Sequence, residues 1–453
     1  MALEVIILAA GKGTRMKSVK PKVLHELAGK SLVARVVEIA KSLNPSKVHL
    51  VYGHGGEQII AAFDGQPLNL IEQAEQKGTG HAVAQVLPDI DPDNEILILY
   101  GDVPLIDSET LNRLTEKASS GFSLLTVDLP SPDGYGRIVR DTDEKVVAIV
   151  EHKDASFAQL AITEVNTGVM CVSGACLRRW LPLLSSENSQ GEYYLTDIVA
   201  MAESEDICIE TEQPKETFEV EGINDRLQLS RMERVFQIKQ AEKLMAQGVT
   251  LMDPARFDLR GTLSAGTDST IDINVVIEGE VTLGSNIRIG PNCVIRNSSI
   301  GDGVEILANS LIEDSKVSND CIIGPYARLR PGSELKSNVK VGNFVEIKKS
   351  TLEVGSKVNH LSYIGDATVG EHANIGAGTI TCNYDGVNKF QTEIGAGAFI
   401  GSNTSLIAPV KIGKNATTGA GSAISKDVSD ENLAIARGKQ RNIDTWQRPV
   451  KKT

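Results

Sequence analysis

The sequence predicts two dissimilar domains, an α/β domain with a mostly parallel sheet and a solenoid of short β-strands, joined by one long helix. Three observations predict this. Strand and helix patterns alternate over the first hundred residues, a helix-forming stretch free of Gly and Pro covers 226–247, and a six-residue repeat runs from about 265 to 424. The predicted parts are residues 1–225, 226–247 and 248–453.

The repeat is the strongest signal in the chain. Its aliphatic residues recur every five or six positions, beginning Ile271, Ile277, Leu283, Ile289 and Ile295 and ending at Ile424, and Gly often follows them. This period fits neither a helix nor an ordinary strand. A short strand and a tight corner give it if three hexads make one coil, which predicts a left-handed parallel β-helix of hexapeptide repeats with the aliphatic residues inside.

The first part of the chain predicts a Rossmann-like arrangement. An apolar run at 3–9 is typical of a strand covered on both faces, and further strands are expected at 47–52, 68–71 and 95–100, with helices at 31–43 and 80–87. Such a sheet binds its ligand at the carboxyl ends of its strands. The helix at 226–247 follows Asn224 and Asp225 and ends before Gly248.

Composition narrows the possible functions. Lys and Arg number 46 against 59 Asp and Glu, a net charge of −13, which argues against nucleic acid or an anionic membrane as the main partner. The six cysteines include no C-x-x-C pair, so we expect reduced thiols without a metal. The chain shows no basic leader and no apolar run of about 18 residues, so we expect a cytoplasmic protein.

A glycine-rich loop follows the first strand. In G-K-G-T-R, Gly11 and Gly13 let backbone N–H groups approach a phosphate chain, and Arg15 and Lys22 can neutralise it. Such a loop alone is equally compatible with a plain turn. Asp102, at the end of a predicted strand, is a candidate metal carboxylate or a cap on the next turn.

In combination, LAAGKGTRM (Leu8, Ala9, Ala10 and the loop), Pro21-Lys22 and Tyr100-Gly101-Asp102 resemble the sugar nucleotidyltransferases. The resemblance implies that Arg15 and Lys22 are catalytic and that Asp102 binds Mg²⁺. It also implies that Gln73, Gly78 and Thr79, otherwise plain loop residues, bind uracil.

The order of the three parts resembles, over essentially the full length, the bacterial family of bifunctional N-acetylglucosamine-1-phosphate uridylyltransferases and glucosamine-1-phosphate N-acetyltransferases. This implies UTP, acetyl-coenzyme A, glucosamine 1-phosphate and N-acetylglucosamine 1-phosphate as substrates, and a homotrimer built through the β-helix. It further implies sugar contacts at Gly136, Glu151 and Asn166, and a second metal ligand at Asn224.

The hexad repeat breaks between Ile375 and Ile394, so about thirteen residues are expected to leave the coil as a loop. Before it lies His360, which could be a solvated surface residue or a base for an amine. The resemblance implies that His360 is the acetyltransfer base. It implies further contacts to the sugar phosphate or acetyl-coenzyme A at Arg330, Lys348, Tyr363, Asn374, Ala377, Asn383, Tyr384, Ser402, Ala420 and Arg437.

Two other hypotheses stay open from the sequence alone. The β-helix could be only an oligomerising or regulatory module, or the protein could be a binding protein with a degenerate transferase fold. The inserted loop and His360 favour an enzyme with two activities over the first, and intact Gly11, Arg15, Lys22 and Asp102 disfavour the second.

Overall fold

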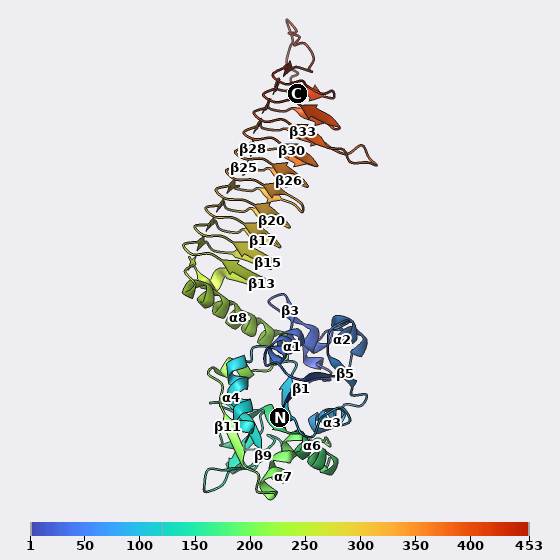
Figure 1. Ribbon diagram of the computed structural model, residues 1–453, viewed down its shortest axis with the longest axis vertical. Helices are drawn as coiled ribbons and strands as arrows, with labels where there is room; N and C mark the ends of the chain where they lie inside the picture. The colour runs from blue at the N-terminus through green and yellow to red at the C-terminus, as the bar shows by residue number, and fades with distance from the viewer. Residues whose placement is uncertain (1, 120, 452–453) are drawn as a thin grey trace. The chain divides into compact units, whose positions relative to one another are not determined.

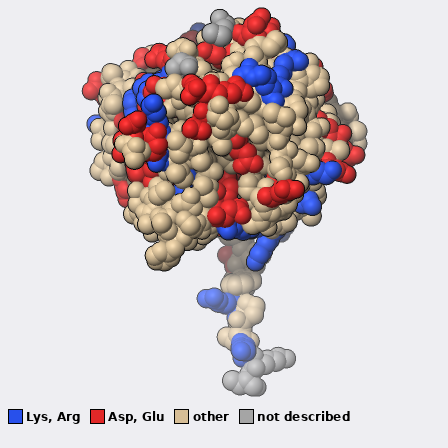
Figure 2. Space-filling view, turned by 90° about the horizontal axis from the view of Figure 1, so that it is seen from below, with Lys and Arg blue, Asp and Glu red and all other residues tan. Residues whose placement is uncertain are grey.

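A computed structural model describes residues 2–119 and 121–451 (Figure 1). The chain divides into two compact units, Met1–Phe236 and Gln237–Thr453. Among the residues that the structure describes, no helix is long and apolar enough to cross a membrane. All six cysteines are free thiols. On the face shown in Figure 2, acidic and basic side chains are interspersed.

The first unit is built on a nine-stranded mixed sheet. Its central part is parallel, in the order β5-β4-β1-β6, and β10 then pairs antiparallel with both β6 and β7. The strands are β1 (Leu3–Ala9), β4 (Lys47–Tyr52), β5 (Asn69–Glu72), β6 (Glu95–Tyr100), β7 (Phe122–Asp128), β8 (Arg137–Arg140), β9 (Val146–Val150), β10 (Glu164–Ser173) and β11 (Ile209–Glu212).

Helices cover both faces of this sheet, which explains the unbroken apolar run of β1. Val5 and Ile7 belong to one buried cluster with α1 (Leu32–Ser42) and α4 (Ser108–Ala118). Ile6 and Leu8 belong to the opposite cluster, with α3 (Thr79–Ala84), α6 (Gly174–Trp180) and α7 (Ile198–Ser204). Because successive side chains of a strand alternate between faces, both faces of β1 must be apolar.

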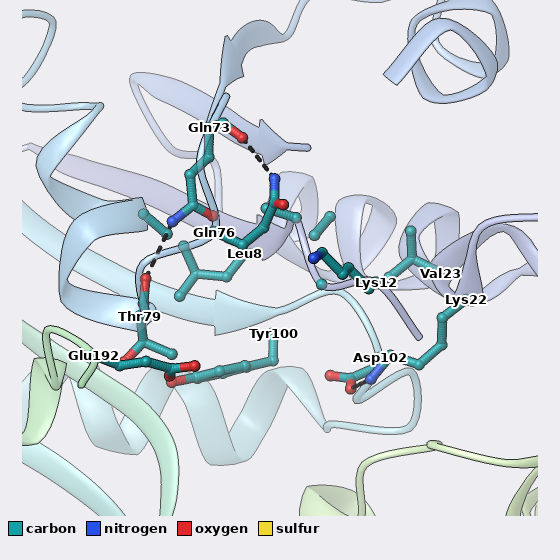
Figure 3. Close-up of a pocket in the computed structure, with 15 residues that line it drawn as sticks. Leu8, Lys12, Lys22, Val23, Gln73, Gln76, Thr79, Tyr100, Asp102 and Glu192 are labelled. Carbon is teal, nitrogen blue, oxygen red and sulfur yellow. Dashed lines mark hydrogen bonds and ion pairs between the residues drawn. The ribbon is translucent and has the colours of Figure 1, made fainter. Parts of the chain in front are cut away.

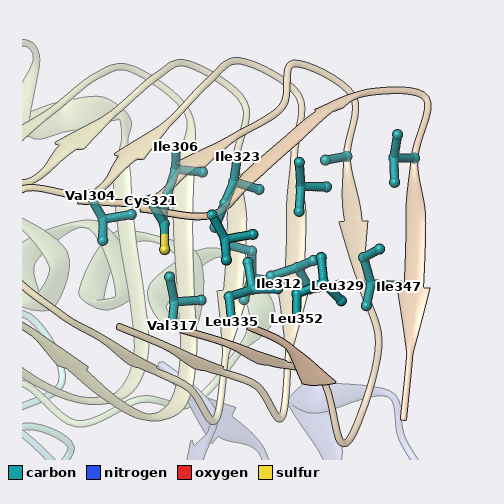
Figure 4. Packing of buried hydrophobic residues seen from close by; sticks show 14 of the residues in the cluster. Val304, Ile306, Ile312, Val317, Cys321, Ile323, Leu329, Leu335, Ile347 and Leu352 are labelled. Atoms are coloured by element: carbon teal, nitrogen blue, oxygen red, sulfur yellow. The ribbon is translucent and has the colours of Figure 1, made fainter. Parts of the chain in front are cut away.

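The second unit is a parallel β-helix, called the prism below. Most coils contribute one strand to an 11-stranded sheet and two to a 17-stranded sheet, whereas the first two coils each contribute a single long strand to the latter. Like residues stack in register, as in Ile289 on Ile306 and Ile306 on Ile323. Every aliphatic residue of the predicted repeat is buried, and Figure 4 shows part of this core. The hexapeptide β-helix is therefore confirmed.

The prism extends beyond the predicted repeat. Before it, β13 (Phe257–Ala265) pairs along its whole length with β15 (Val275–Leu283). After it, Val428 is still buried and β39 (Leu433–Ala434) pairs with β37 (Thr417–Thr418). The register therefore continues past Ile424, where the sequence pattern becomes polar.

The break in the repeat is shorter than predicted. Thr381, in β32 (Ile380–Cys382), takes the inward position and is 1% exposed. Its hydroxyl accepts the Gly365 amide at 2.7 Å and lies 3.0 Å from the Gly365 carbonyl, so a polar side chain is satisfied inside the prism. Between β32 and β33 (Thr392–Ile394), residues 383–391 leave the coil as a loop, so the estimate of thirteen is wrong.

One helix, α8 (Arg226–Ala246), contributes to both units. In the first unit, Met232 packs in a cluster with Leu27, Leu32 and Ile223. In the second, the buried Gln237 amide donates to the Leu259 carbonyl at 3.0 Å and accepts the Leu259 N–H at 2.7 Å. Gln237 thereby pairs with the backbone of an edge strand as another strand would.

Two candidate active sites

The first candidate site is a cavity of about 480 Å³ at the carboxyl ends of β1 and β6 (Figure 3). Its lining includes most of the residues predicted for the nucleotide, namely Leu8, Ala9, Ala10, Gly11, Lys22, Gln73, Gly78, Thr79, Tyr100 and Asp102. These residues come from the loop after β1, the segment after β5 and the end of β6. The sheet topology therefore brings together stretches that are far apart in the sequence.

Lys22 lies between the two predicted metal ligands. Its ammonium group donates to Asp102 Oδ2, as Figure 3 shows, and to Asn224 Oδ1 at 3.1 Å. Arg15 donates to the same Asn224 oxygen at 2.8 Å. The Gly13 turn has φ 59°, and a Cβ there would come within 2.4 Å of Lys22 Cβ, so glycine lets the loop close onto Lys22.

Asp102 and Asn224 fit a magnesium ion by donor chemistry. A carboxylate oxygen and an amide oxygen converge on one cation, Lys22 Nζ, and Mg²⁺ prefers such oxygen ligands. Among the described residues, no group of three or more His, Cys, Asp or Glu side chains could hold a metal. Mg²⁺ is commonly held by one or two protein oxygens together with substrate phosphates and water, so this pair suffices.

Tyr100 forms the floor of the cavity beside Asp102. Burial raises the pKa of its hydroxyl above the ordinary value, and the nearby Glu151 and Asp102 carboxylates add to this. A Cβ at Gly168 would lie 2.5 Å from the Tyr100 ring, so this glycine gives the ring its place. The Gly101 amide donates to the Leu8 carbonyl at 2.9 Å, which ties the end of β6 to β1.

The three predicted sugar residues lie together beside this cavity. The backbone N–H of Asn166 donates to the Gly136 carbonyl at 2.9 Å, and a Cβ at Gly136 would lie 3.5 Å from Glu151 Oε1. Burial raises the pKa of Glu151, and the Asp154 and Asp197 carboxylates add to the rise. The Thr196 hydroxyl, which donates to Glu151 Oε1 at 3.2 Å, opposes it.

Five lining residues were not among the predicted site residues: Lys12, Val23, Gln76, Ala82 and Glu192. Lys12 and Val23 adjoin predicted residues, so their position in the motif could have suggested them. Glu192 comes from a segment without a recognisable pattern, and only the fold reveals its place in the cavity.

The second candidate site surrounds one corner of the prism, where strands of the 11-stranded sheet turn toward the 17-stranded sheet. Successive coils place Asn343, His360, Ala377, Ser402 and Ala420 at this corner, called the His360 corner below. The backbone ladder fixes the alignment, since Gly378 donates to the His360 carbonyl at 3.2 Å and Asn403 to the Ala377 carbonyl at 2.7 Å. Three predicted residues on different coils, Ala377, Ser402 and Ala420, thus align with His360.

His360 is exposed and oriented by a neighbour that the sequence did not reveal. It ends β28 (Lys357–His360), and its Nδ1 lies 2.8 Å from Asn343 Oδ1 on the preceding coil. An amide oxygen can only accept, so Nδ1 carries the proton. The Nε2 lone pair of the neutral ring is therefore free to accept a proton.

Cationic and polar residues lie on or next to the strands that begin or end at this corner. Arg330 donates to Glu346 at 2.7 Å, and this hydrogen bond raises the pKa of the guanidinium. Glu346 and Lys348 belong to β26 (Glu346–Lys348), which pairs with β29 (Tyr363–Gly365), so Tyr363 lies beside Glu346. Asn374 begins β31 on the other side of the corner.

The loop 383–391 is anchored at one end and open at the other. Asn383 is 7% exposed and its amide donates to Asp366 on the preceding coil. Tyr384 is exposed and forms a β-bridge with Lys389, which shapes the loop as a small hairpin. Arg437, after the last coil, donates to the Ala420 carbonyl at 2.8 Å and so reaches the His360 corner.

Comparison with known proteins matches both units. Residues 5–175 match the MobA-like NTP transferase domain, and residues 391–426 match the bacterial transferase hexapeptide (six repeats). Relatives that match the chain over nearly its whole length carry the name "Bifunctional protein GlmU". The protein of Idiomarina loihiensis is 61% identical over 100% of this chain and 99% of its own. That of Saccharophagus degradans is 60% identical over 99% and 100%, and that of Cellvibrio japonicus 58% over 100% of both.

These identities extend over the whole length of the chain, through both units and both candidate sites. The two matched domain families also stand in the order of the two units. The chain belongs to the family of bifunctional GlmU proteins.

Proposed function

We propose that this protein makes UDP-N-acetylglucosamine by two reactions, acetyl transfer in the prism and uridylyl transfer in the first unit. One observation carries the proposal. A single chain of this family holds a phosphate-type site around Lys22, Asp102 and Asn224, and an exposed, oriented histidine at the His360 corner. These two sites suit two different group transfers, one of a phosphoryl group and one of an acyl group.

In the acetyl transfer, the amine of glucosamine 1-phosphate attacks the thioester carbonyl carbon of acetyl-coenzyme A. The C–N bond forms, the C–S bond breaks, and His360 Nε2 takes the proton from the nitrogen. Asn343 keeps the proton of neutral His360 on Nδ1 and stabilises the imidazolium that forms. Arg330 and Lys348 supply positive charge for the sugar phosphate, and the His360 corner receives the extended coenzyme.

In the uridylyl transfer, a phosphate oxygen of N-acetylglucosamine 1-phosphate attacks the α-phosphorus of UTP, and pyrophosphate leaves. The attacking group is already an anion, so no general base is needed. Arg15 and Lys22 offset the repulsion between the two phosphorylated substrates. Asp102 and Asn224 would hold Mg²⁺, which when bound neutralises phosphate charge. Gly136, Glu151 and Asn166 orient the sugar, and Gln73, Gly78 and Thr79 bind the base.

The homotrimer is part of the proposal, and an exposed apolar ladder supports it. Tyr326, Phe344 and Leu361 are 52%, 56% and 63% exposed, and the first two rings stack at 5.2 Å. All three adopt left-handed backbone conformations, which L-residues with large side chains adopt at a cost. The neighbouring Asn309 and Gly378 occupy the equivalent turns more easily. A second prism packed against this ladder would offset the cost and border the His360 corner.

The proposal is tested by giving the purified protein acetyl-coenzyme A, glucosamine 1-phosphate, UTP and Mg²⁺. We expect UDP-N-acetylglucosamine, free coenzyme A thiol and pyrophosphate, and no nucleotide sugar when Mg²⁺ is chelated. If N-acetylglucosamine 1-phosphate replaces glucosamine 1-phosphate, acetyl-coenzyme A should become dispensable. A protein that binds these compounds without turnover, or performs only one reaction, contradicts the proposal. We expect the enzyme in the cytoplasm.

A further inference from the structure

Asp366 lies at the corner of the prism between β29 and β30 (Ala367–Val369). Successive coils place residues with positive φ at this corner, called the Asp366 corner below: Asn297, Asp314, Gly332, Lys349 and Asp366. Gly, Asn and Asp adopt this conformation more readily than other residues do. The corner nevertheless accepts Lys as well, so the backbone alone does not require Asp at position 366.

Asp366 contacts the chain on both sides of the loop 383–391, which projects from the prism in Figure 1. Before the loop's tip, its carboxylate accepts a hydrogen bond from the side-chain amide of Asn383. After the loop, its backbone carbonyl accepts the Thr392 N–H at 3.1 Å, where β33 begins. The Asn383 carbonyl accepts the Phe390 N–H at 2.9 Å, which closes the base of the loop. One residue of the preceding coil therefore fixes where the chain leaves the prism and where it returns.

The Asp366 carboxylate also orients the Asn383 amide. A carboxylate can only accept, so the amide nitrogen faces Asp366 and the amide oxygen faces away from it. Among the residues that the structure describes, Asp366 is the only hydrogen-bond partner of the Asn383 side chain. Because Asn383 is 7% exposed, losing this partner would leave a largely buried amide free to rotate.

Other predicted residues of the acetyl-transfer site lie next to Asp366. Its N–H donates to the Lys348 carbonyl at 3.0 Å. A Cβ at Gly365 would lie 2.4 Å from the Tyr363 hydroxyl oxygen, so the Tyr363 side chain extends over Gly365 toward the Asp366 corner. Lys348, Tyr363 and Asn383 come from three successive coils and meet around this one carboxylate.

We propose that Asp366 is a positioning residue for acetyl transfer, which fixes the Asn383 amide and with it the start of the loop 383–391. The side chain of Asp366 contacts Asn383, so its effect on the reaction passes through Asn383. This inference rests on the proposed acetyl transfer. A residue that only stabilised the prism would act independently of Asn383, whereas a positioning residue has no further effect once Asn383 is removed.

The test uses full-length variants that place at position 366 residue types already found at the Asp366 corner. Asp366→Gly removes the carboxylate, Asp366→Lys replaces it with a cation that repels the amide nitrogen, and Asp366→Asn keeps an oxygen that can accept. We expect kcat/KM for acetyl transfer to fall about 10- to 100-fold in the first two, the effect of one hydrogen bond to a charged group. It should stay within about threefold of wild type in Asp366→Asn.

Asp314→Gly is the matched control, because Asp314 is an exposed residue of the same corner with the same left-handed backbone. It should leave acetyl transfer unchanged, and uridylyl transfer should stay at the wild-type rate in every variant. An equal loss of acetyl transfer in Asp314→Gly and Asp366→Gly would overturn the inference, because the loss would then come from the flexibility of the corner. A loss in Asp366→Asn as large as that in Asp366→Gly would overturn it as well.

A double-variant cycle separates positioning from stability. Asn383→Ala should itself lower acetyl transfer, since Asn383 belongs to the proposed site. In that background Asp366→Gly should change the rate by less than about twofold. Losses that multiply in the double variant would overturn the inference. If Asp366→Gly does not fold, Asp366→Lys takes its place in the cycle, because Lys349 shows that the corner accepts Lys.

Hydrogen–deuterium exchange provides a readout that needs no turnover. In Asp366→Gly and Asp366→Lys, peptides covering residues 383–392 should exchange faster than in the wild type, and peptides from the preceding coils should not. If the wild-type protein transfers no acetyl group, the proposed function fails, and the exchange rates still decide the inference about Asp366. Unchanged exchange of residues 383–392 in both variants would overturn it.

Discussion

Lys22 contacts both of the side chains that we propose as ligands of Mg²⁺. Its ammonium joins Asp102 to Asn224, so the pair is already arranged around a positive charge. The first prediction follows from that charge. Asp102→Asn should lower uridylyl transfer at least about 100-fold, because it removes a negative ligand from the Mg²⁺ site, and leave acetyl transfer near the wild-type rate.

Initial rates of the two half-reactions, measured separately, check this prediction. Asp107→Asn is a matched control, because Asp107 caps α4 by accepting the Glu109 amide at 2.8 Å and Asn can make the same bond. Equal losses of both activities in a folded Asp102→Asn protein would show that the two sites are not independent.

Glu151 lends itself to a prediction about pH. Burial raises its pKa above the ordinary value of 4.5, so the folded protein holds this proton more tightly than the unfolded chain does. The protonated Glu151 carboxyl therefore adds to the free energy of unfolding at low pH, and this contribution is lost as the pH rises from 4.5 through the raised pKa. Glu151→Gln keeps an oxygen for the Thr196 hydroxyl without the charge, and should raise Tm at pH 7 by roughly 1–3 °C.

Calorimetric melting of wild-type and Glu151→Gln protein between pH 4 and pH 7 tests the sign. The difference in Tm should shrink toward zero near pH 4, where the wild-type carboxyl is protonated as well. Glu203→Gln, an exposed carboxyl on α7, should change Tm little at either pH. A Glu151→Gln protein that is less stable than the wild type at pH 7 would mean that the carboxylate is stabilised in the fold.

His360 is the residue on which the second reaction depends. His360→Ala should lower acetyl transfer by about 10² to 10⁴-fold, the usual contribution of a general base, and leave uridylyl transfer intact. The loss should shrink as the pH rises past the pKa of the substrate amine, because the amine then arrives deprotonated. Rates between pH 6 and pH 9 measure this. His372→Ala removes an exposed histidine of the same prism and should lower the rate of acetyl transfer little. An equally small loss in His360→Ala would show that His360 is only a surface residue.

The strands were predictable where the apolar pattern was continuous. The predicted strands 3–9, 47–52 and 95–100 coincide with β1, β4 and β6, because strands buried on both faces are largely apolar. The helix expected at 31–43 begins at Leu32, since the Ser31 hydroxyl caps it by accepting the Ala34 amide at 3.3 Å. Helix ends depend on such single contacts and are harder to predict.

The repeat predicted the prism but not the coil at its break. A hydrophobic pattern cannot identify Thr381 as an inward residue, because its burial depends on hydrogen bonds to Gly365 on the previous coil. The same limit applies to Asn343, whose importance lies in one contact to a predicted site residue, His360. The sequence thus indicated which side chains could react, and the fold revealed those that orient them.

The two units differ in how they build a core. The first buries both faces of one sheet under helices, whereas the prism stacks like residues on successive coils, so each coil depends on its neighbours. Residues of α8 belong to both cores, because the boundary between the two units falls within this helix, between Phe236 and Gln237. Met232 closes a cluster of the first unit, and Arg35 lies 4.2 Å from the Phe236 ring centroid.

The packing of α8 decides where the chain can be cut. A fragment of residues 1–236 keeps Met232 and Phe236 with their partners, and we expect it to fold and to transfer uridylyl groups at close to the full-length rate. A fragment of residues 1–225 lacks both side chains and should unfold at a lower temperature, because Leu27, Leu32 and Ile223 lose their cover. Both fragments should lack acetyl transfer.

On light scattering the 1–236 fragment should be monomeric and the full chain trimeric, since the exposed ladder of Tyr326, Phe344 and Leu361 lies in the prism. A trimeric 1–236 fragment would mean that the first unit, rather than the prism, holds the assembly together.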